Sequence, residues 1–132
     1  MKPAKVPGLL NLQTEIFNAL NDSKIAAAYD EAPDEAPEPY ISIGDSDIAD
    51  DDSKNCCGDE ITEDIHVWSK AKGFRECKMI VQKIISLFST VNLSNSAYQI
   101  ALIKKETSFS REYDGTVRHG LVRLTFKVYQ ED

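Results

Sequence analysis

Residues 59–89, "DEITEDIHVWSKAKGFRECKMIVQKIISLFS", change from one hydrophobic period to another. From Asp59 to Trp68, apolar and polar residues largely alternate, which is typical of a strand with one buried face. From Phe74 onward, apolar residues recur every three or four positions, which indicates an amphipathic helix. A strand that runs directly into such a helix predicts a sheet with a helix packed on it.

These two patterns also predict which side chains are buried. The strand is expected to face inward with Ile61, Ile65 and Val67. Its opposite face is expected to carry Thr62, Asp64, His66 and Trp68. The helix is expected to bury Phe74, Cys77, Ile80, Val81, Ile84 and Phe88. Each large apolar side chain contributes roughly 1.5–3 kcal/mol when buried, so we expect this stripe to anchor the core.

Residues 97–130 predict a long hairpin with an Asp114-Gly115 turn. A two-residue turn would place Lys105 opposite Leu124 and set a polar residue against an apolar face. The apolar faces match when Leu102 lies opposite Phe126. We therefore expect a three-residue loop, 113–115, with positive φ at Gly115, or a bulge elsewhere that restores the match.

The remaining segments complete an α+β fold. Residues 9–20 place Leu9, Leu12, Ile16 and Leu20 on one helical face, and "PYISIGD" (39–45) indicates a short strand. We expect a single domain, 1–132, with an antiparallel sheet of about four strands in two hairpins. Two helices are expected to pack on one face of that sheet.

The net charge of −7 is unevenly distributed. Residues 30–64 hold 14 acidic residues and one basic residue, Lys54, whereas the other 97 residues are mildly basic. We interpret residues 45–59 as an exposed acidic hairpin loop. Such a loop can orient a partner or a second copy of the chain, and it disfavours tight binding of nucleic acid through that face.

The N-terminal residues show no signal peptide, and no apolar run is long enough for a membrane span. Three cysteines without a repeated spacing fit a reducing compartment better than a disulfide framework. These features predict a soluble protein that is intracellular when it is synthesised.

Motifs for metal binding or catalysis are weak. An EF-hand starting at Asp45 fails at three diagnostic positions, although a looser carboxylate site for Ca²⁺ or Mg²⁺ stays open. Adjacent Cys56 and Cys57, with Cys77 and His66, have poor spacing for zinc. No nucleophile or phosphate-binding motif accompanies either histidine. We therefore expect no enzyme and no cofactor, and a function that depends on the surfaces of the protein.

Three segments together resemble one protein family. They are "YDEAPDEAPEPYISIGD" (29–45), "IHVWSKAKGFRECKMI" (65–80) and "DGTVRHGLVRLTFKV" (114–128). In order and spacing they are similar to the tail-completion proteins of tailed phages. This family is also called tail terminator or tail-to-head joining proteins, and the lambda U protein is related to it. The acidic loop with its Cys-Cys pair departs from the family pattern.

The resemblance implies a structural virion protein in the neck between tail and head. Such a protein forms a homohexameric ring that caps the tail tube, stops its polymerisation and joins it to the head connector. DNA passes through the central channel without specific binding. The implied partners are therefore further copies of the chain, the tail tube protein and the connector or stopper protein. Assembly would take place in the host cytoplasm, without a membrane.

Two interface regions follow from the surface charge and this resemblance. The first comprises Asp45, Asp47, Asp50, Asp51, Asp52 and Lys54. The second, on the hairpin, comprises Lys104, Lys105, Arg111, Tyr113 and Arg118. Five further positions match the family pattern and are interpreted as structural: Tyr40, Gly44, His66, Trp68 and Gly120. If the acidic residues face the channel, they would repel DNA.

Alternative functions come from other classes. One is a head–tail connector, stopper or adaptor protein of the same neck. Another is a metal-binding enzyme that uses the acidic loop, and a third is a cellular adaptor unrelated to virions. The sequence also leaves open a phage, a prophage or a gene transfer agent as the source.

Overall fold

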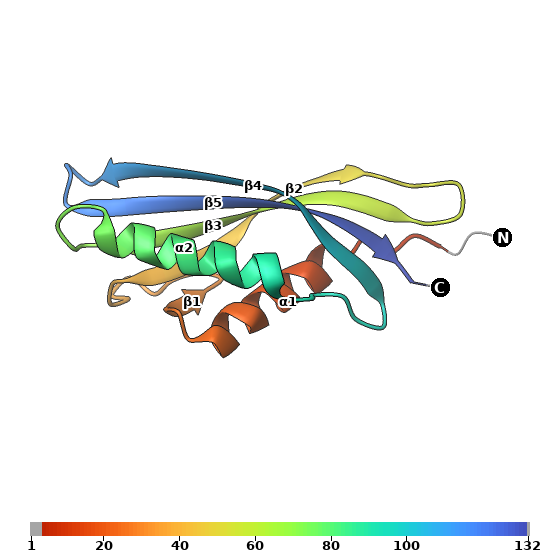
Figure 1. The fold of residues 1–132 in the computed structure, drawn as a ribbon, viewed down its shortest axis with the longest axis horizontal. Helices are drawn as coiled ribbons and strands as arrows, with labels where there is room; N and C mark the ends of the chain where they lie inside the picture. The colour runs from red at the N-terminus through yellow and green to blue at the C-terminus, as the bar shows by residue number, and fades with distance from the viewer. Residues whose placement is uncertain (1–3, 132) are drawn as a thin grey trace.

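The computed structural model describes residues 4–131 and contains, within them, two helices and five strands. In chain order these are α1 (Leu9–Ser23), β1 (Ala27–Tyr29), β2 (Tyr40–Asp50), β3 (Gly58–Ser69), α2 (Arg75–Thr90), β4 (Tyr98–Glu112) and β5 (Val117–Gln130). Both helices lie on the same side of the sheet (Figure 1). The predicted α+β class and the placement of the helices are therefore confirmed.

The strands form one sheet in the order β1-β2-β3-β5-β4. β1 pairs with β2 in parallel and the other neighbours are antiparallel, so the sheet is mixed and has one strand more than predicted. The missed strand, β1, has three residues, "AAY", which are too few for an alternating pattern to show. β4 forms an edge of the sheet along its whole length.

The core lies between the helices and the inner face of the sheet. α1 buries Leu12, Ile16 and Leu20, and α2 buries Cys77, Ile80, Val81, Ile84 and Phe88. Opposite them, β3 buries Ile61, Ile65 and Val67, as its alternation predicts. β5 buries Val122, Leu124, Phe126 and Val128.

Glycine at position 120 lets α2 approach the sheet closely. A Cβ atom at Gly120 would lie 2.9 Å from both Cys77 Sγ and Val81 Cγ2. Any larger residue would therefore force β5 and α2 apart.

The β4–β5 hairpin confirms the predicted pairing but corrects the predicted loop. Leu102 lies opposite Phe126, as the match of apolar faces requires. The turn is not a three-residue loop, because Glu112 pairs with Val117 and four residues, 113–116, lie between them. A bulge at Ile103 restores the match, and Lys105 does lie opposite Leu124 beyond it. A bulge of this kind was the predicted alternative to the three-residue loop. Gly115 also has the predicted positive φ.

The acidic segment 45–59 is not one long loop, which corrects the sequence interpretation. β2 continues to Asp50 and β3 begins at Gly58, so the connection is only residues 51–57. The continuation was hidden because a bulge at Gly44, with φ of 135°, shifts the alternation of β2. Beyond the bulge every residue of β2 is exposed, including Ile48, so burial does not mark this part of the strand.

Candidate interaction surfaces

The β2–β3 turn and the β4–β5 turn lie at opposite ends of the elongated molecule (Figure 1). We name the first the acidic end and define it by Asp50, Asp51, Asp52 and Asp59. We name the second the basic end, together with the adjoining start of α2, and define it by Arg75, Lys78, Arg111 and Arg118. The two predicted interface regions thus lie largely at separate ends of the same sheet.

A lysine from the N-terminal segment holds the acidic end together. Lys5 Nζ lies 2.7 Å from Asp50 Oδ1 and 3.0 Å from a carboxylate oxygen of both Asp52 and Asp59. It also donates to the backbone oxygen of Gly58 at 2.9 Å. Hydrogen bonds to these carboxylates raise the pKa of Lys5, so the side chain stays charged. Asp59 is almost fully buried and depends on this partner.

The rest of the acidic turn is ordered by side-chain contacts. Tyr129 donates to Asp51 Oδ2 at 2.9 Å, and this bond raises the pKa of the tyrosine. Asp52 Oδ1 accepts from the backbone N–H of Gly58 at 2.9 Å. Asp50 remains mostly exposed despite its ion pair, and Lys54 is also exposed. The turn therefore presents a fixed, mostly acidic surface.

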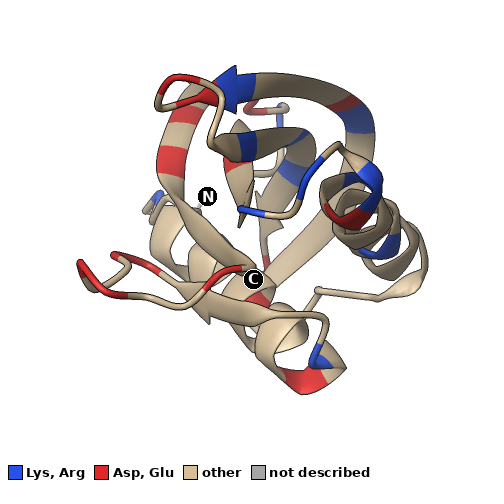
Figure 2. Ribbon diagram, turned by 90° about the vertical axis from the view of Figure 1, so that its left-hand side faces the viewer, with Lys and Arg blue, Asp and Glu red and all other residues tan. Residues whose placement is uncertain are grey.

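Two aromatic rings organise the basic end. Phe74 and Phe109 pack edge to face with ring centroids 6.1 Å apart. Arg111 and Arg118 lie 5.1 and 5.6 Å from the Phe74 centroid, and Lys78 lies 5.5 Å from the Phe109 centroid. These cation–π contacts hold three positive charges around one aromatic pair. Figure 2 views the molecule from this end and shows Lys and Arg residues together with some acidic residues.

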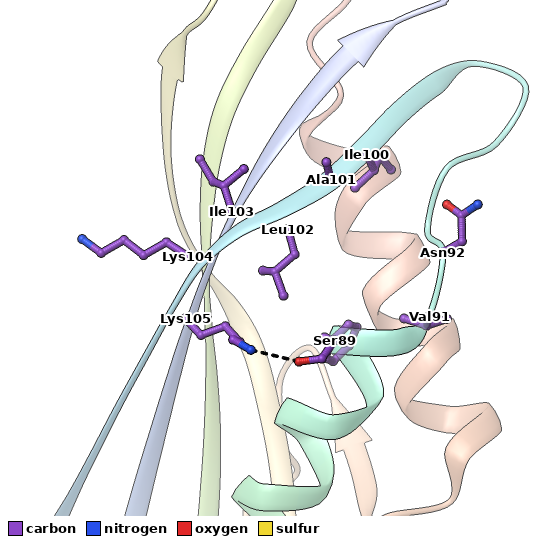
Figure 3. A pocket seen from close by; sticks show the side chains of 10 residues that line it. Ser89, Val91, Asn92, Ile100, Ala101, Leu102, Ile103, Lys104 and Lys105 are labelled. Carbon is purple, nitrogen blue, oxygen red and sulfur yellow. Dashed lines mark hydrogen bonds between the residues drawn. The ribbon is translucent and has the colours of Figure 1, made fainter.

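A groove of about 510 Å³ lies between the end of α2 and the β4 edge (Figure 3). Lys105 Nζ donates to Ser89 Oγ at 3.1 Å across the groove, and Leu102 points into it. Lys104 points away from the groove and forms an ion pair with Glu106 at 2.8 Å. This pairing raises the pKa of Lys104 and lowers the pKa of Glu106. A strand edge beside a groove lined by both polar and apolar side chains suits the addition of an extended segment.

The outer face of the sheet, which neither helix covers, carries a row of rings. Trp68 stacks on His119 with centroids 4.1 Å apart and donates to Ser42 Oγ at 3.0 Å. Tyr40 lies beside Trp68, and partial burial raises the pKa of this tyrosine. These contacts fix the strands that carry the predicted structural residues.

Two histidines connect carboxylates across this outer face. His66 Nδ1 lies 2.8 Å from His119 Nε2, and His66 Nε2 lies 2.9 Å from Asp45 Oδ2. On the other side, His119 Nδ1 lies 3.5 Å from Glu112 Oε1. Burial and the neighbouring His66 lower the pKa of His119. The sequence did not predict this arrangement, because the histidines are 53 residues apart and meet only when β3 pairs with β5.

Arg123 neutralises part of the negative charge on β2 and β3. Its guanidinium lies 3.3 Å from Asp47 Oδ2 and 3.0 Å from Asp64 Oδ1. Lys127 similarly lies 3.7 Å from Asp51 Oδ2. Much of the acidic segment is therefore paired within the chain, although Asp45 and Asp47 keep most of their side-chain surface exposed.

The three cysteines and His66 do not form a zinc site. Cys77 lies in the core, where burial raises its pKa to about 11, and it packs beneath Gly120. Cys57 is buried and Cys56 is exposed, and no disulfide joins the three cysteines. Within residues 4–131, the group with donor atoms close enough for a metal ion is Asp45, Asp64 and His66.

Comparisons with known proteins define the class. Residues 9–129 match the family described as tail completion protein gp17. In a solved structure titled "Virion of native gene transfer agent (GTA) particle", one chain is 23% identical and superimposes with a TM-score of 0.67. The alignment covers 92% of this chain and 95% of that one. No curated protein sequence matches significantly.

The chain is thus a structural protein of a virion tail. It belongs to the tail completion protein gp17 family, as the three sequence segments predicted. Among the described residues, neither helix has the length and hydrophobicity needed to cross a bilayer.

Proposed function

We propose that copies of this chain form a ring that caps the tail tube, ends its polymerisation and joins it to the head connector. The observation that carries the proposal is the placement of the acidic and basic ends at opposite ends of one sheet (Figure 1). Two different surfaces on one protomer suit a head-to-tail contact, which closes into a ring when the rotation between copies permits. The family resemblance implies six copies.

In the proposed contact, the acidic end of one copy meets the basic end of the next. Asp50 supplies an exposed negative charge, and Arg111 supplies an exposed positive charge. Opposite charges on facing surfaces orient the partners and disfavour contact between identical ends. Both charges lie on strand residues beside the turns and already contact the chain, Asp50 through Lys5 and Arg111 through the Phe74 ring. Little side-chain freedom is therefore lost on contact.

The β4 edge is proposed as a second surface, for the tail tube protein or the connector. Its groove offers Leu102 to an apolar side chain, and Lys104 and Lys105 flank the unpaired strand edge. Tyr113 in the β4–β5 turn is also exposed. The protein would act in the neck of the virion after assembly in the host cytoplasm.

We further propose that acidic residues 47–52 face the central channel or a neighbouring protomer. Carboxylates along the channel would repel the DNA backbone and let it pass without specific binding. A ring structure in which Asp47 to Asp52 lie far from both the channel and any partner would refute this placement.

Electron microscopy of particles made without this gene tests the function. Abnormally long tubes and filled heads without tails are expected, because nothing stops the tube or joins it to the head. Normal-length tubes with unjoined heads would favour the connector or stopper role. Normal particles would refute a role in the neck altogether.

A further inference from the structure

The His66–His119 pair on the outer face lies between two carboxylates, Asp45 and Glu112. Three contacts run in series: Asp45 to His66, His66 to His119, and His119 to Glu112. An ionised carboxylate only accepts hydrogen bonds, and a neutral imidazole brings one N–H and one acceptor nitrogen. Two neutral histidines supply the two hydrogens that the bonds to Asp45 and between the rings need. Glu112, 3.5 Å away, then faces a nitrogen of His119 that carries no hydrogen. A further cation at His66 would let His119 keep a hydrogen on that nitrogen.

The place for that cation is His66 Nε2. If a metal ion binds there, His66 is left with Nδ1–H, which donates to His119 Nε2. His119 then keeps Nδ1–H, which is directed at Glu112. Both remaining contacts are satisfied with neutral rings. This is the arrangement by which proteins orient a metal-binding histidine, whose second nitrogen donates to another group.

We propose that Asp45, Asp64 and His66 bind a divalent transition-metal ion of the zinc class on the outer face of the sheet. One donor atom from each of these residues lies within 4.8 Å of the other two. One imidazole and two carboxylates form a donor set that zinc accepts, with water in the remaining position. Ca²⁺ and Mg²⁺ prefer oxygen donors alone, so the histidine disfavours them.

The surroundings place the ligands and let an ion enter. Asp45 follows the Gly44 bulge, which directs it beside His66, and most of its side chain is exposed. Asp64 and His66 lie two positions apart on β3, so both side chains are on the outer side of the strand. Asp64 also contacts Arg123 Nε at 3.0 Å, so an ion has to share or displace this pairing.

His119 and Glu112 act as positioning residues, because they hold the His66 ring without touching the ion. His119 is fixed by its stacking on Trp68, with ring planes only 5° apart. Glu112 in turn faces His119 from β4. The ligands thus come from β2 and β3, and the positioning residues come from β5 and β4. A bound ion would link Asp45 on β2 to the ligands on β3.

Isothermal titration of the tag-free, full-length protein with ZnCl₂ at pH 7.5 tests the proposal. About one ion per chain is expected to bind. His66→Gln should abolish this binding, and His119→Gln should weaken it about 10- to 100-fold, as is typical when the group orienting a metal ligand is removed. Circular dichroism of each variant checks that it folds.

The double variant Cys56→Ser/Cys57→Ser is the matched control, because thiolates also attract zinc. It should bind zinc as the parent does. Loss of binding in this variant, with binding retained in His66→Gln, would assign the ion to the cysteines and overturn the proposal.

A second measurement needs no variant. Nitrogen-15 NMR of the histidine rings should show, on zinc addition, His66 with Nδ1 protonated and Nε2 metal-bound. If the rings do not respond to zinc, no metal ion binds His66 and the proposal is wrong.

Discussion

The two ends of the sheet are held by different interactions. At the basic end, α2 covers the sheet, and Phe74 and Phe109 pack together beneath the positive charges. At the acidic end, Lys5 from the N-terminal segment pairs with three carboxylates, and apolar packing contributes less. The comparison shows that one continuous sheet can present charge in two ways. Packing supports the basic end and ion pairs support the acidic end. Added salt should therefore change the stability of the two ends by different amounts.

The largest effect is expected from closing the space between β5 and α2. Gly120→Val should lower the free energy of unfolding by about 2–3 kcal/mol, because its side chain would overlap Cys77 and Val81. Chemical denaturation measures this loss. Adding Val81→Ala should recover part of it, and an equal loss in the double variant would show that the cause is not overpacking.

At the acidic end, Lys5→Met should lower the melting temperature by leaving the buried Asp59 without its cation. Lys54→Met, at an exposed lysine of the same turn, should change it little. Because salt screens charges, the difference between Lys5→Met and the parent should shrink as NaCl increases. A difference that does not depend on salt would mean that Lys5 acts by packing.

Between the two ends, Glu63 is a buried carboxyl on the inner face. Ser46 Oγ donates to its Oε2 at 2.6 Å, and Oε1 has no hydrogen-bond partner among the described residues. Burial raises the pKa of Glu63, so the folded state favours the protonated form. The carboxylate therefore destabilises the fold increasingly as the pH rises above the unfolded value of about 4.3.

Glu63→Gln should accordingly raise the free energy of unfolding by about 1 kcal/mol at pH 8. The gain should fall towards zero as the pH drops below the unfolded value, because the parent then becomes protonated in both states. Denaturation at a series of pH values measures it. A gain that grows as the pH falls would contradict the stated direction of the pKa.

The smallest effect is expected at the surface of the basic end. Arg111→Gln removes a charge 5.1 Å from the Phe74 ring and should lower the free energy of unfolding by about 0.5 kcal/mol. Arg75→Gln, a neighbouring exposed arginine, serves as the control. Equal losses in both variants would show that the ring contact contributes nothing specific.

The sequence predicted those parts of the fold whose period is uninterrupted. β3, β5 and α2 largely keep one hydrophobic period, and most of their buried residues agree with the prediction. Two positions differ: Phe74 precedes α2 and is only half-buried, contrary to the prediction, and the polar Glu63 occupies a buried position of β3. In β2 the Gly44 bulge shifts the phase and the outer half is exposed, so its acidic residues were interpreted as loop. In the hairpin, matching Leu102 with Phe126 predicted either a three-residue loop or a bulge elsewhere, and it did not show that the bulge lies at Ile103.

The sequence predicted which residues form the candidate surfaces, but not where these surfaces lie relative to each other. Asp50 and Arg111 were both named, yet their positions at opposite ends depend on the strand order. The role of Lys5 was missed, since an ion pair that spans 54 residues to Asp59 leaves no local pattern. The contact between His66 and His119 was missed for the same reason.

The central claim, that the acidic end of one copy meets the basic end of the next, is tested most directly by charge reversal. Asp50→Lys, Arg111→Glu and the double variant would each be supplied to a particle-producing genome that lacks the gene. Joined head–tail particles would then be counted by electron microscopy, after melting curves have confirmed that each variant folds. We predict that each single variant yields few joined particles and that the double variant restores them. Full yield from both single variants, or no recovery in the double variant, would contradict the account.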